Sequence, residues 1–469
     1  MFTTDSSFTR KAQETPLLND VNVLIIDEAH ERSLHTDVVL GIAHLLLQQR
    51  DDFFVVIASA TIDPKPFLKF FGLTSVPLKV EGRLYPIALE YRPFDNNKAK
   101  DDKSKGKGQG QGDIGEGEEV HAMRVMSKND FVVDHVIPET SSALKRYDVG
   151  HVLVFLPGQM EINKAVQAME KRKIPKLIVL SLFGGMSEED QDDVMRFEEK
   201  HPGGNRMVVF CTNVAETSIT VPGVKIVIDS GLAKESRFDN KRKLQVVEEI
   251  FISRSSANQR KGRAGRVSSG TCIRLYAESD LQRDNIEPEI LRSSLDRVAL
   301  ELLCLGKDPE QFPFIAREED TSTDGSFGTD LKAAIALLHT LQCCKQQPQV
   351  VVVGEGDEGG EGSSGEYVKT PVGQLFNELP FDPRICAFIM TAYCEFDCLD
   401  DVVIVAALLM ASGPIFFTGG KTTDANKKAQ ARQQGEYIPI LYLSSTSIWT
   451  LTYLLVSITP YSRRGSHAP

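Results

Sequence analysis

The chain has 469 residues, of which 41% are hydrophobic and 25% are charged, and its formal net charge at pH 7 is −12. Such a length holds two or three domains with large cores, and such a composition is that of a soluble globular protein. The acidic balance excludes a uniformly basic protein that coats nucleic acid, although it leaves room for a locally basic channel.

The eight cysteines are scattered along the chain, and none of them belongs to a CxxC pair or a His-Cys cluster with zinc spacing. This pattern favours buried, reduced thiols over metal ligands. No signal peptide opens the sequence. We therefore expect a reducing compartment, nuclear or cytoplasmic.

The first informative stretch is the apolar run Val23–Ile26, which leads directly into Asp27 and Glu28. An unalternating apolar run predicts a strand buried on both faces, as in a parallel α/β sheet. Ligands bind at the carboxyl ends of such strands. There, one carboxylate can hold Mg²⁺ on a nucleotide while its neighbour orients or deprotonates the attacking water. The alternative is a strand that simply ends in polar residues.

The full string DEAHER, from Asp27 to Arg32, resembles motif II of the DEAH-box RNA helicases. Apolar residues at helical spacing predict a helix over 34–49, and a second buried strand is expected over 53–58. That strand runs into a Ser-Ala-Thr triplet at 59–61. Placed after such a strand and helix, the triplet resembles motif III of the same family.

The phosphate-binding sequence GxxxxGK[ST] occurs nowhere in the chain. The backbone cradle and the lysine that hold nucleotide phosphates are therefore missing from these residues. Because the family places this loop upstream of motif II, we interpret the chain as an N-terminally truncated member. We expect it not to hydrolyse ATP at a helicase-like rate by itself.

A second α/β unit is predicted from about residue 129. A buried strand is expected over 152–156 and further strands over 177–182, 207–211 and 224–228, with a helix after the turn at Gly158. The string CTNVAETSIT, which begins at Cys211, closely resembles motif V. Hydroxyls and amides at such a strand end can donate hydrogen bonds to nucleic-acid phosphates, although these residue types more often cap helices or form turns.

The octet QRKGRAGR, residues 259–266, resembles motif VI. Gln259, Arg263 and Arg266 share one face if this segment is a helix. Two guanidinium groups on one face suit a triphosphate, because arginine binds phosphate bidentately. The glycines at 262 and 265 are expected to let the segment approach another backbone closely.

The resemblance implies an α/β fold of two RecA-like parallel-sheet domains, the first incomplete, followed by winged-helix and helical-bundle (ratchet) domains. A helix is predicted over 285–308, a second over 330–341, and ratchet helices over 384–395 and 399–411. We expect the two RecA-like domains at 1–92 and 129–283, a disordered insert at 93–128, the winged-helix domain at 284–345, an acidic glycine-rich loop at 346–366, the ratchet domain at 367–437 and a divergent hydrophobic tail at 438–469.

The resemblance also implies ATP and Mg²⁺ as cofactors and a role for each motif residue. Asp27 would hold Mg²⁺ through water, Glu28 would activate the hydrolytic water, and His30 would link motif II to the second domain. The other implied groups are Ser59, Ala60 and Thr61 for coupling, Thr212, Asn213 and Thr217 for nucleic-acid phosphate, Ser218 and Asp229 for the nucleotide, and Gln259, Arg263 and Arg266 for closure over the γ-phosphate.

Three functions stay open. The first is an ATP-dependent RNA helicase that binds single-stranded or structured RNA and an activating protein partner. The second is a non-catalytic RNA-binding or scaffold protein derived from a helicase. The third is a membrane-tethered interaction protein, because residues 438–459 are uncharged and long enough to span a bilayer. Their many Ser and Thr residues make this third function the least favoured.

Overall fold

The computed structural model describes residues 2–59, 64–74, 76–80, 85–93, 131–201, 203–216, 219–240, 242–319, 326–347 and 366–410. The chain divides into two compact units. Unit 1 comprises residues 1–294 and 313–327, and unit 2 comprises residues 295–312 and 328–469. The predicted insert at 93–128, most of the loop at 346–366 and the tail at 438–469 lie outside the described residues. Within the described part, no helix is long and apolar enough to cross a membrane.

Unit 1 begins with a small two-stranded sheet and its helices. Strands β1 (Val23–Ile26) and β2 (Phe54–Ile57) pair in parallel. They are joined by α2 (Leu34–Gln49), whose first turn is capped by the Ser33 hydroxyl. These elements lie where the apolar periodicity predicts them, so both strands and the helix are confirmed. The short helices α1 (Asp5–Glu14) and α3 (Lys65–Phe70) complete this part.

The prediction that β1 is buried on both faces is wrong. Leu24 and Ile26 are buried, whereas Val23 and Ile25 are 51% and 65% exposed. Burial alternates because the sheet has only two strands among the described residues, and one of its faces is open to solvent. The prediction that the second strand is buried is wrong as well: Phe54 and Val56 of β2 are exposed on that face, and Val55 and Ile57 are only half-buried.

A six-stranded, entirely parallel sheet forms the larger part of unit 1. Its spatial order is β3-β10-β7-β4-β6-β5. All five residues of β4, at the centre, are buried, as its apolar sequence predicts. The strands are β3 (Ile87–Tyr91), β4 (His151–Phe155), β5 (Leu177–Leu182), β6 (Arg206–Cys211), β7 (Val224–Asp229) and β10 (Gly270–Arg274).

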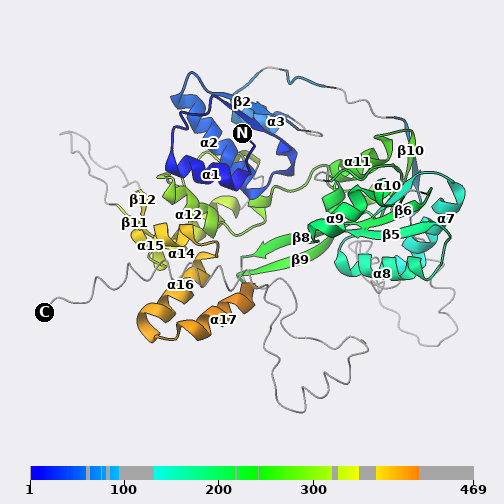
Figure 1. Cartoon of the computed structure of the whole chain (residues 1–469). Helices are drawn as coiled ribbons and strands as arrows, with labels where there is room; N and C mark the ends of the chain where they lie inside the picture. Colours follow the sequence, from blue (N-terminus) through cyan, green and yellow to red (C-terminus); the bar gives the residue numbers. More distant parts are fainter. Residues whose placement is uncertain are drawn as a thin grey trace, which may run out of the picture. The chain divides into compact units, whose positions relative to one another are not determined.

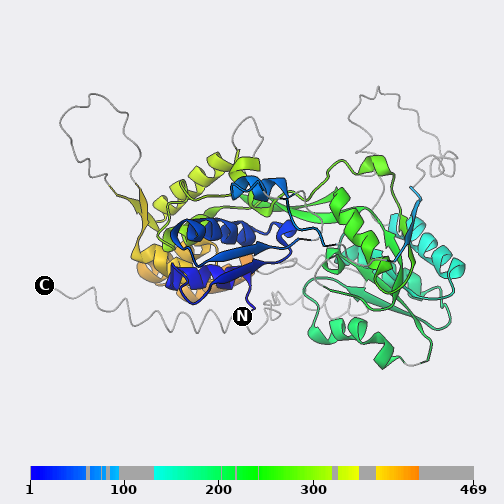
Figure 2. The same cartoon turned by 90° about the horizontal axis from the view of Figure 1, so that it is seen from above.

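Helices cover both faces of this sheet (Figures 1 and 2). On one face, Val152 and Val154 pack with α7 (Ile137–Arg146) and α8 (Gln159–Glu170). On the other, Leu153 and Phe155 pack with residues of the second group of helices. That group contains α9 (Glu188–Met195) and α10 (Phe197–Lys200). The alternation along one strand thus joins two hydrophobic cores into a doubly covered α/β layer.

Strand β3 corrects the predicted boundary of the first domain at residue 92. Ile87 lies opposite Gly270, and the whole strand pairs in parallel with β10. Residues 87–91 therefore belong to the second sheet and not to the sheet that holds motif II. Their partner strand lies far away in sequence, so local periodicity carries no signal of this pairing.

The structure also contains an antiparallel hairpin that was not predicted. Strands β8 (Leu232–Asp239) and β9 (Leu244–Phe251) pair along their full length, with Leu232 opposite Phe251. The segment between them carries a basic run. The hairpin as a whole connects the end of β7 to α11 (Arg254–Gly262), the helix that contains the first residues of motif VI.

The helix predicted over 285–308 is too long. A single turn, η6 (Glu289–Leu291), is followed by α12 (Asp296–Cys304). Serines at 293 and 294 separate the two, and serine competes with helical hydrogen bonding through its side chain. In unit 1, α13 (Ala316–Glu319) follows.

Unit 2 is mainly helical among its described residues. Arg297 of α12 donates hydrogen bonds to the carbonyl oxygens of Phe376, Asn377 and Leu379, which lie at the end of α15. The predicted ratchet helices correspond to α16 followed by η7, and to α17. The elements are α14 (Ser326–Thr340), β11 (Cys344–Gln346), β12 (Tyr367–Lys369), α15 (Pro371–Glu378), α16 (Pro383–Thr391), η7 (Ala392–Phe396) and α17 (Leu399–Met410).

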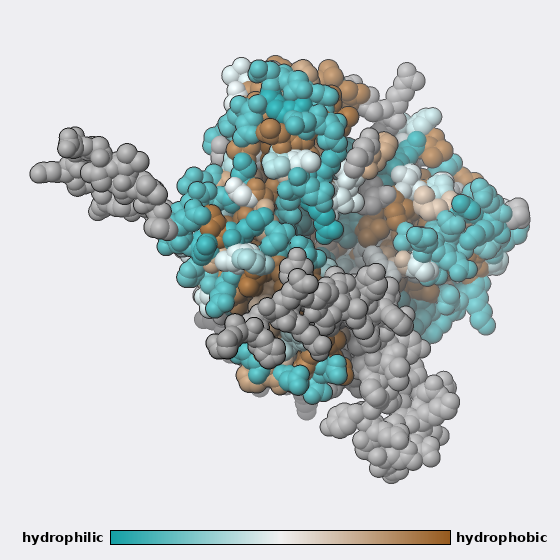
Figure 3. All heavy atoms as spheres, turned by 60° about the vertical axis from the view of Figure 1, so that its left-hand side comes forward, coloured by the Kyte–Doolittle hydropathy of each residue, from teal (hydrophilic) through white to brown (hydrophobic). Residues whose placement is uncertain are grey.

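Hydrophilic residues cover most of the described surface in the view of Figure 3, and hydrophobic residues gather in smaller groups between them. This distribution agrees with the charged content of the chain. It is the surface expected of a folded protein that keeps most of its large apolar side chains inside.

Candidate functional site

The end of β1 displays two carboxylates on a strained turn. Glu28 has a left-handed backbone (φ 50°, ψ 34°), a conformation that costs a residue other than glycine about 1–3 kcal/mol and is common at functional sites. The Glu28 N–H donates to Asp27 Oδ1 at 2.9 Å. The Ala29 N–H donates to the Ala58 carbonyl at the end of β2. Both Asp27 and Glu28 are exposed, so this turn presents their carboxylates to a ligand.

His30 joins motif II to motif VI. Its ring Nε2 lies 2.5 Å from the side-chain nitrogen of Gln259, which is 229 residues away in sequence. The two side chains are therefore joined by a hydrogen bond. His30 Nδ1 lies 3.3 Å from Glu28 Oε2. His30 thus contacts both the Glu28 carboxylate and the motif VI helix.

The predicted coupling triplet is described only in part. Ser59 follows β2 and is exposed. The preceding Ala58 N–H donates to the Ile26 carbonyl at 2.8 Å, which places this segment one strand away from Asp27. Ala60 and Thr61 lie outside the described residues.

Motif V begins at the carboxyl end of β6. The Thr212 N–H donates to the Leu182 carbonyl of the neighbouring strand at 3.1 Å. Asn213 starts the short turn η3 (Asn213–Ala215), and its side chain is exposed. Thr217 and Ser218 are outside the described residues. Glu216, which directly precedes them, is buried.

Motif VI is not one continuous α-helix. Helix α11 ends at Gly262 and continues as the tighter turn η4 (Arg263–Gly265). Arg263 is 7% exposed and donates to the Ile219 carbonyl at 3.2 Å. Arg266 is exposed and donates to the Thr220 hydroxyl. The two guanidinium groups therefore differ in burial, although both contact the last two residues of the motif V string, Ile219 and Thr220.

The charge of Arg263 interacts with carboxylates of both motif V and motif II. Burial, together with the charge of Arg266, lowers the pKa of Arg263 to about 10, and the carboxylates of Glu216 and Glu28 oppose this shift. Glu28 is thus close enough to act on the charge of a motif VI arginine. Arg263 remains protonated at neutral pH, which is the state needed to bind phosphate.

Only one of the two motif VI glycines is required by a close approach. A Cβ atom on Gly265 would lie 2.8 Å from the carbonyl oxygen of Tyr85. The N–H of Tyr85 also donates a hydrogen bond to the carbonyl oxygen of Gly265. A Cβ atom on Gly262 would meet nothing within 4 Å. The expected close approach is therefore confirmed at Gly265, where the backbone leading into β3 passes, and is not found at Gly262.

The sequence analysis did not single out Arg260, the most deeply buried charged residue of motif VI. Arg260 is 0% exposed. Its guanidinium donates to Glu216 Oε1 at 2.7 Å and to Asp229 Oδ1 at 2.8 Å. The same group lies 4.8 Å from the ring centroid of Phe155. Tyr276 donates to the second oxygen of Asp229 at 2.7 Å.

The opposite charges of this cluster compensate one another. Burial opposes the charge of Arg260, but Glu216 and Asp229 outweigh burial and raise the pKa of Arg260. Burial raises the pKa of Glu216, and Arg260 counteracts that rise. Arg260 thereby fastens the motif VI helix to the residue that precedes Thr217 and to the end of β7. A spacing signal existed, since Arg260 lies four and three residues after Ser256 and Ala257 and therefore shares a helix face with them.

The structure corrects the prediction that Asp229 contacts the nucleotide. Its side chain is 0% exposed. Oδ1 accepts from Arg260 and from the Gly231 N–H, and Oδ2 accepts from Tyr276. A carboxylate so enclosed holds Arg260 in place and does not reach a ligand.

The exposed groups fit a magnesium nucleotide. Magnesium prefers one or two carboxylates and completes its octahedron with water and phosphate oxygens, so the exposed Asp27 is a suitable ligand. Within the described ranges, no cluster of three or more His, Cys, Asp or Glu residues could hold a metal unaided. The site thus brings together carboxylates from motif II and arginines from motif VI, and His30 with Gln259 lies between them.

Comparisons with known proteins agree with these motifs. The family described as "Helicase conserved C-terminal domain" matches residues 128–268. The chain is 34% identical over 415 residues to the ATP-dependent RNA helicase HrpA of Escherichia coli strain K12, covering 88% of this chain and 28% of the relative. It is 34% identical over 421 residues to the probable ATP-dependent RNA helicase DHX34 of Homo sapiens, covering 88% and 32% respectively.

A solved structure resembles the fold over nearly the whole chain. The Escherichia coli DEAH/RHA helicase HrpB superimposes with a TM-score of 0.65 at 26% identity, and the match covers 92% of this chain and 48% of that one. The chain spans about a third of the length of the HrpA and DHX34 relatives.

Proposed function

The chain belongs to the DEAH-box helicases of superfamily 2, and from this premise we propose that it acts in an ATP-dependent RNA helicase. Such a motor couples ATP hydrolysis to movement along single-stranded RNA. The observation that carries the proposal is the contact of His30 with Gln259, because it joins the carboxylate-bearing turn to the arginine-bearing turn. A site divided in this way assembles when the two parts close and comes apart when they open.

We assign the nucleotide chemistry to exposed groups at the two turns. Asp27 would hold Mg²⁺, which would supply the positive charge that neutralises the phosphates. Glu28 orients and deprotonates the attacking water, and His30 lies beside it, with Nδ1 3.3 Å from Glu28 Oε2. Arg263 and Arg266 stabilise the charge that develops on the γ-phosphate. Gln259 closes the site by binding His30, and Ser218 senses the nucleotide.

We assign RNA contacts to motif V. Thr212, Asn213 and Thr217 follow β6, and hydroxyl and amide groups of this kind donate to backbone phosphates. Ser59, Ala60 and Thr61 relay the nucleotide state to this surface. Glu216 provides the physical connection, because Arg260 holds it against the motif VI helix.

A non-catalytic RNA-binding protein is the second candidate. The specific observation in its favour is that GxxxxGK[ST] occurs nowhere in these 469 residues. Carboxylates and arginines without a phosphate cradle do not position a triphosphate for in-line attack. RNA binding through motif V needs no such cradle.

Phosphate release, measured with and without single-stranded RNA, tests the proposal. We expect negligible turnover by the 469 residues alone. We expect RNA-stimulated turnover when the P-loop segment of the HrpA relative is joined upstream. In the joined protein, Glu28→Gln abolishes turnover, whereas the control Asp51→Asn, at an exposed carboxylate after α2, leaves it unchanged.

The two candidates give different results in this experiment. A helicase shows Glu28-dependent turnover once the loop is present. A joined protein that binds RNA but releases no phosphate supports the non-catalytic candidate. Strong Glu28-dependent turnover by the 469 residues alone would contradict the role given to the missing loop.

A further inference from the structure

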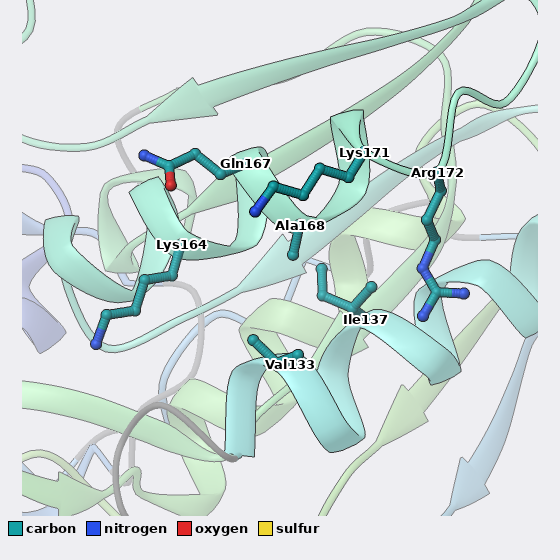
Figure 4. A pocket seen from close by; sticks show the side chains of 7 residues that line it. All are labelled: Val133, Ile137, Lys164, Gln167, Ala168, Lys171 and Arg172. Atoms are coloured by element: carbon teal, nitrogen blue, oxygen red, sulfur yellow. The ribbon is translucent and has the colours of Figure 1, made fainter. Parts of the chain in front are cut away.

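A pocket of about 370 Å³ lies between α8 and the segment formed by η2 (Val132–Val136) and α7. Figure 4 shows Val133 and Ile137 pointing from this segment toward Ala168 on α8. These three side chains form an aliphatic floor. Val133 is 46% exposed, although it sits beside the fully packed core of the second sheet. The volume is within the range of ligand-binding pockets.

The rim of this pocket is basic. Lys164 and Lys171 reach it from α8, and Arg172 reaches it from the turn that follows (Figure 4). None of the residues that line the pocket is acidic. Basic residues at a helix C-terminus complement the helix dipole, which accounts for Lys171 and Arg172. It does not account for the half-exposed Val133 beside these two residues.

The basic end of this pocket is remote from the candidate nucleotide site. Helix α8 starts after the carboxyl end of β4 and returns along the sheet, so Lys171 and Arg172 lie at the amino ends of the strands. Thr212 and Asp229 lie at the carboxyl ends of the neighbouring strands β6 and β7. A ligand at the rim therefore does not compete directly for the motif residues.

We propose that this pocket binds a short acidic segment of a partner protein, which inserts an aliphatic side chain between Val133 and Ala168. The carboxylates of that segment pair with Lys171 and Arg172. Charge complementarity favours an acidic segment, because the lining residues include basic side chains and no acidic one. A protein segment fits better than RNA, since RNA bases stack on aromatic side chains and no described lining residue is aromatic.

Fluorescence anisotropy of a labelled peptide tests this proposal on the full chain. The probe is a short peptide of alternating glutamate pairs and single leucines, and a matched peptide carries serine in place of each leucine. We expect saturable binding of the leucine peptide, weakened by salt because its ion pairs are exposed. The variant Lys171→Glu/Arg172→Glu lowers the affinity at least tenfold. The control Lys145→Glu/Lys332→Glu makes the same change in net charge at exposed positions outside the pocket and leaves the affinity within twofold.

Each other outcome overturns the proposal. Equal loss in the control variant shows non-specific attraction. Equal binding of the serine peptide shows that the aliphatic floor is not used. Displacement of the peptide by single-stranded RNA, lost in the Lys171/Arg172 variant, assigns the pocket to RNA. The peptide-binding titration does not depend on ATP hydrolysis or on helicase activity, so its result is independent of the helicase proposal.

Discussion

The guanidinium of Arg260 and the carboxylate of Asp229 form an ion pair, 2.8 Å long, in which neither side chain is exposed to solvent. Glu216 adds a second carboxylate to the same guanidinium at 2.7 Å. Two acids and one base in the interior leave an excess negative charge, which the Tyr276 hydroxyl moderates by donating to Asp229. Burial without full pairing is costly, so each member of this cluster depends on the others.

Replacing Arg260 should therefore cost more stability than replacing any surface arginine. We expect Arg260→Met to lower the free energy of unfolding by about 3–5 kcal/mol, because two buried carboxylates lose their partner. Arg254→Met is the control, since Arg254 forms an exposed ion pair with Asp284 of a kind worth about 0–1 kcal/mol. Urea denaturation followed by circular dichroism measures both. Equal losses in the two variants would contradict the structural role of Arg260.

The contact between His30 and Gln259 should be measurable as a coupling energy. A double-mutant cycle with His30→Ala and Gln259→Ala is expected to give about 0.5–1.5 kcal/mol of interaction in the unfolding free energy, the range of a single intramolecular hydrogen bond. The control cycle pairs Gln259→Ala with His44→Ala, a histidine that contacts Phe70 and Gln48 instead. That cycle should be additive. A coupling near zero in the first cycle would show that motifs II and VI are not joined by this bond in solution.

Local patterns in the sequence predict the elements but not their partners. Val23–Ile26 and Leu34–Gln49 occur at the predicted positions, because apolar spacing is set by nearby residues. The placement of β3 in the second sheet depends on a strand far away in sequence. The hairpin of β8 and β9 was missed for a different reason, since its basic residues conceal the strand pattern.

In the candidate site, too, the sequence predicts local features but not tertiary contacts. The motif strings predict which residues gather near the nucleotide, and the structure brings His30, Glu28 and Gln259 together. The strings do not show burial, which separates Arg260 and Asp229 from the ligand-facing groups. A carboxylate at a strand end can serve a ligand or a buried base, and only tertiary packing decides between these roles.

Acid should weaken the attachment of β3 to α7. Burial alone would raise the pKa of Glu90, but hydrogen bonds from Arg92 and Arg146 outweigh it and hold the pKa below the ordinary value of 4.5. A lowered folded-state pKa adds stability that is present above 4.5 and is lost as the pH falls through the lowered value. We expect Glu90→Gln to cost about 1 kcal/mol at pH 7 and progressively less as the pH is lowered toward 3.

Urea denaturation at the two pH values measures this difference. Glu170→Gln, at an exposed glutamate at the end of α8, serves as the control and should change the unfolding free energy little at either pH. A cost of Glu90→Gln that persists undiminished at pH 3 would show that Glu90 acts through packing and not through its charge.

RNA binding should depend on motif V and on salt. Phosphate contacts release counterions, so we expect the affinity of the chain for single-stranded RNA to fall steeply as salt rises. Thr212→Ala removes a hydroxyl at the carboxyl end of β6 and should weaken binding about threefold to tenfold, the value of one hydrogen bond. The control Thr74→Ala removes an exposed hydroxyl outside the motifs and should have no effect. Anisotropy of a labelled oligoribonucleotide at two salt concentrations provides the measurement. Binding that is insensitive to salt, or equally weakened by both substitutions, would exclude motif V as the RNA-phosphate surface.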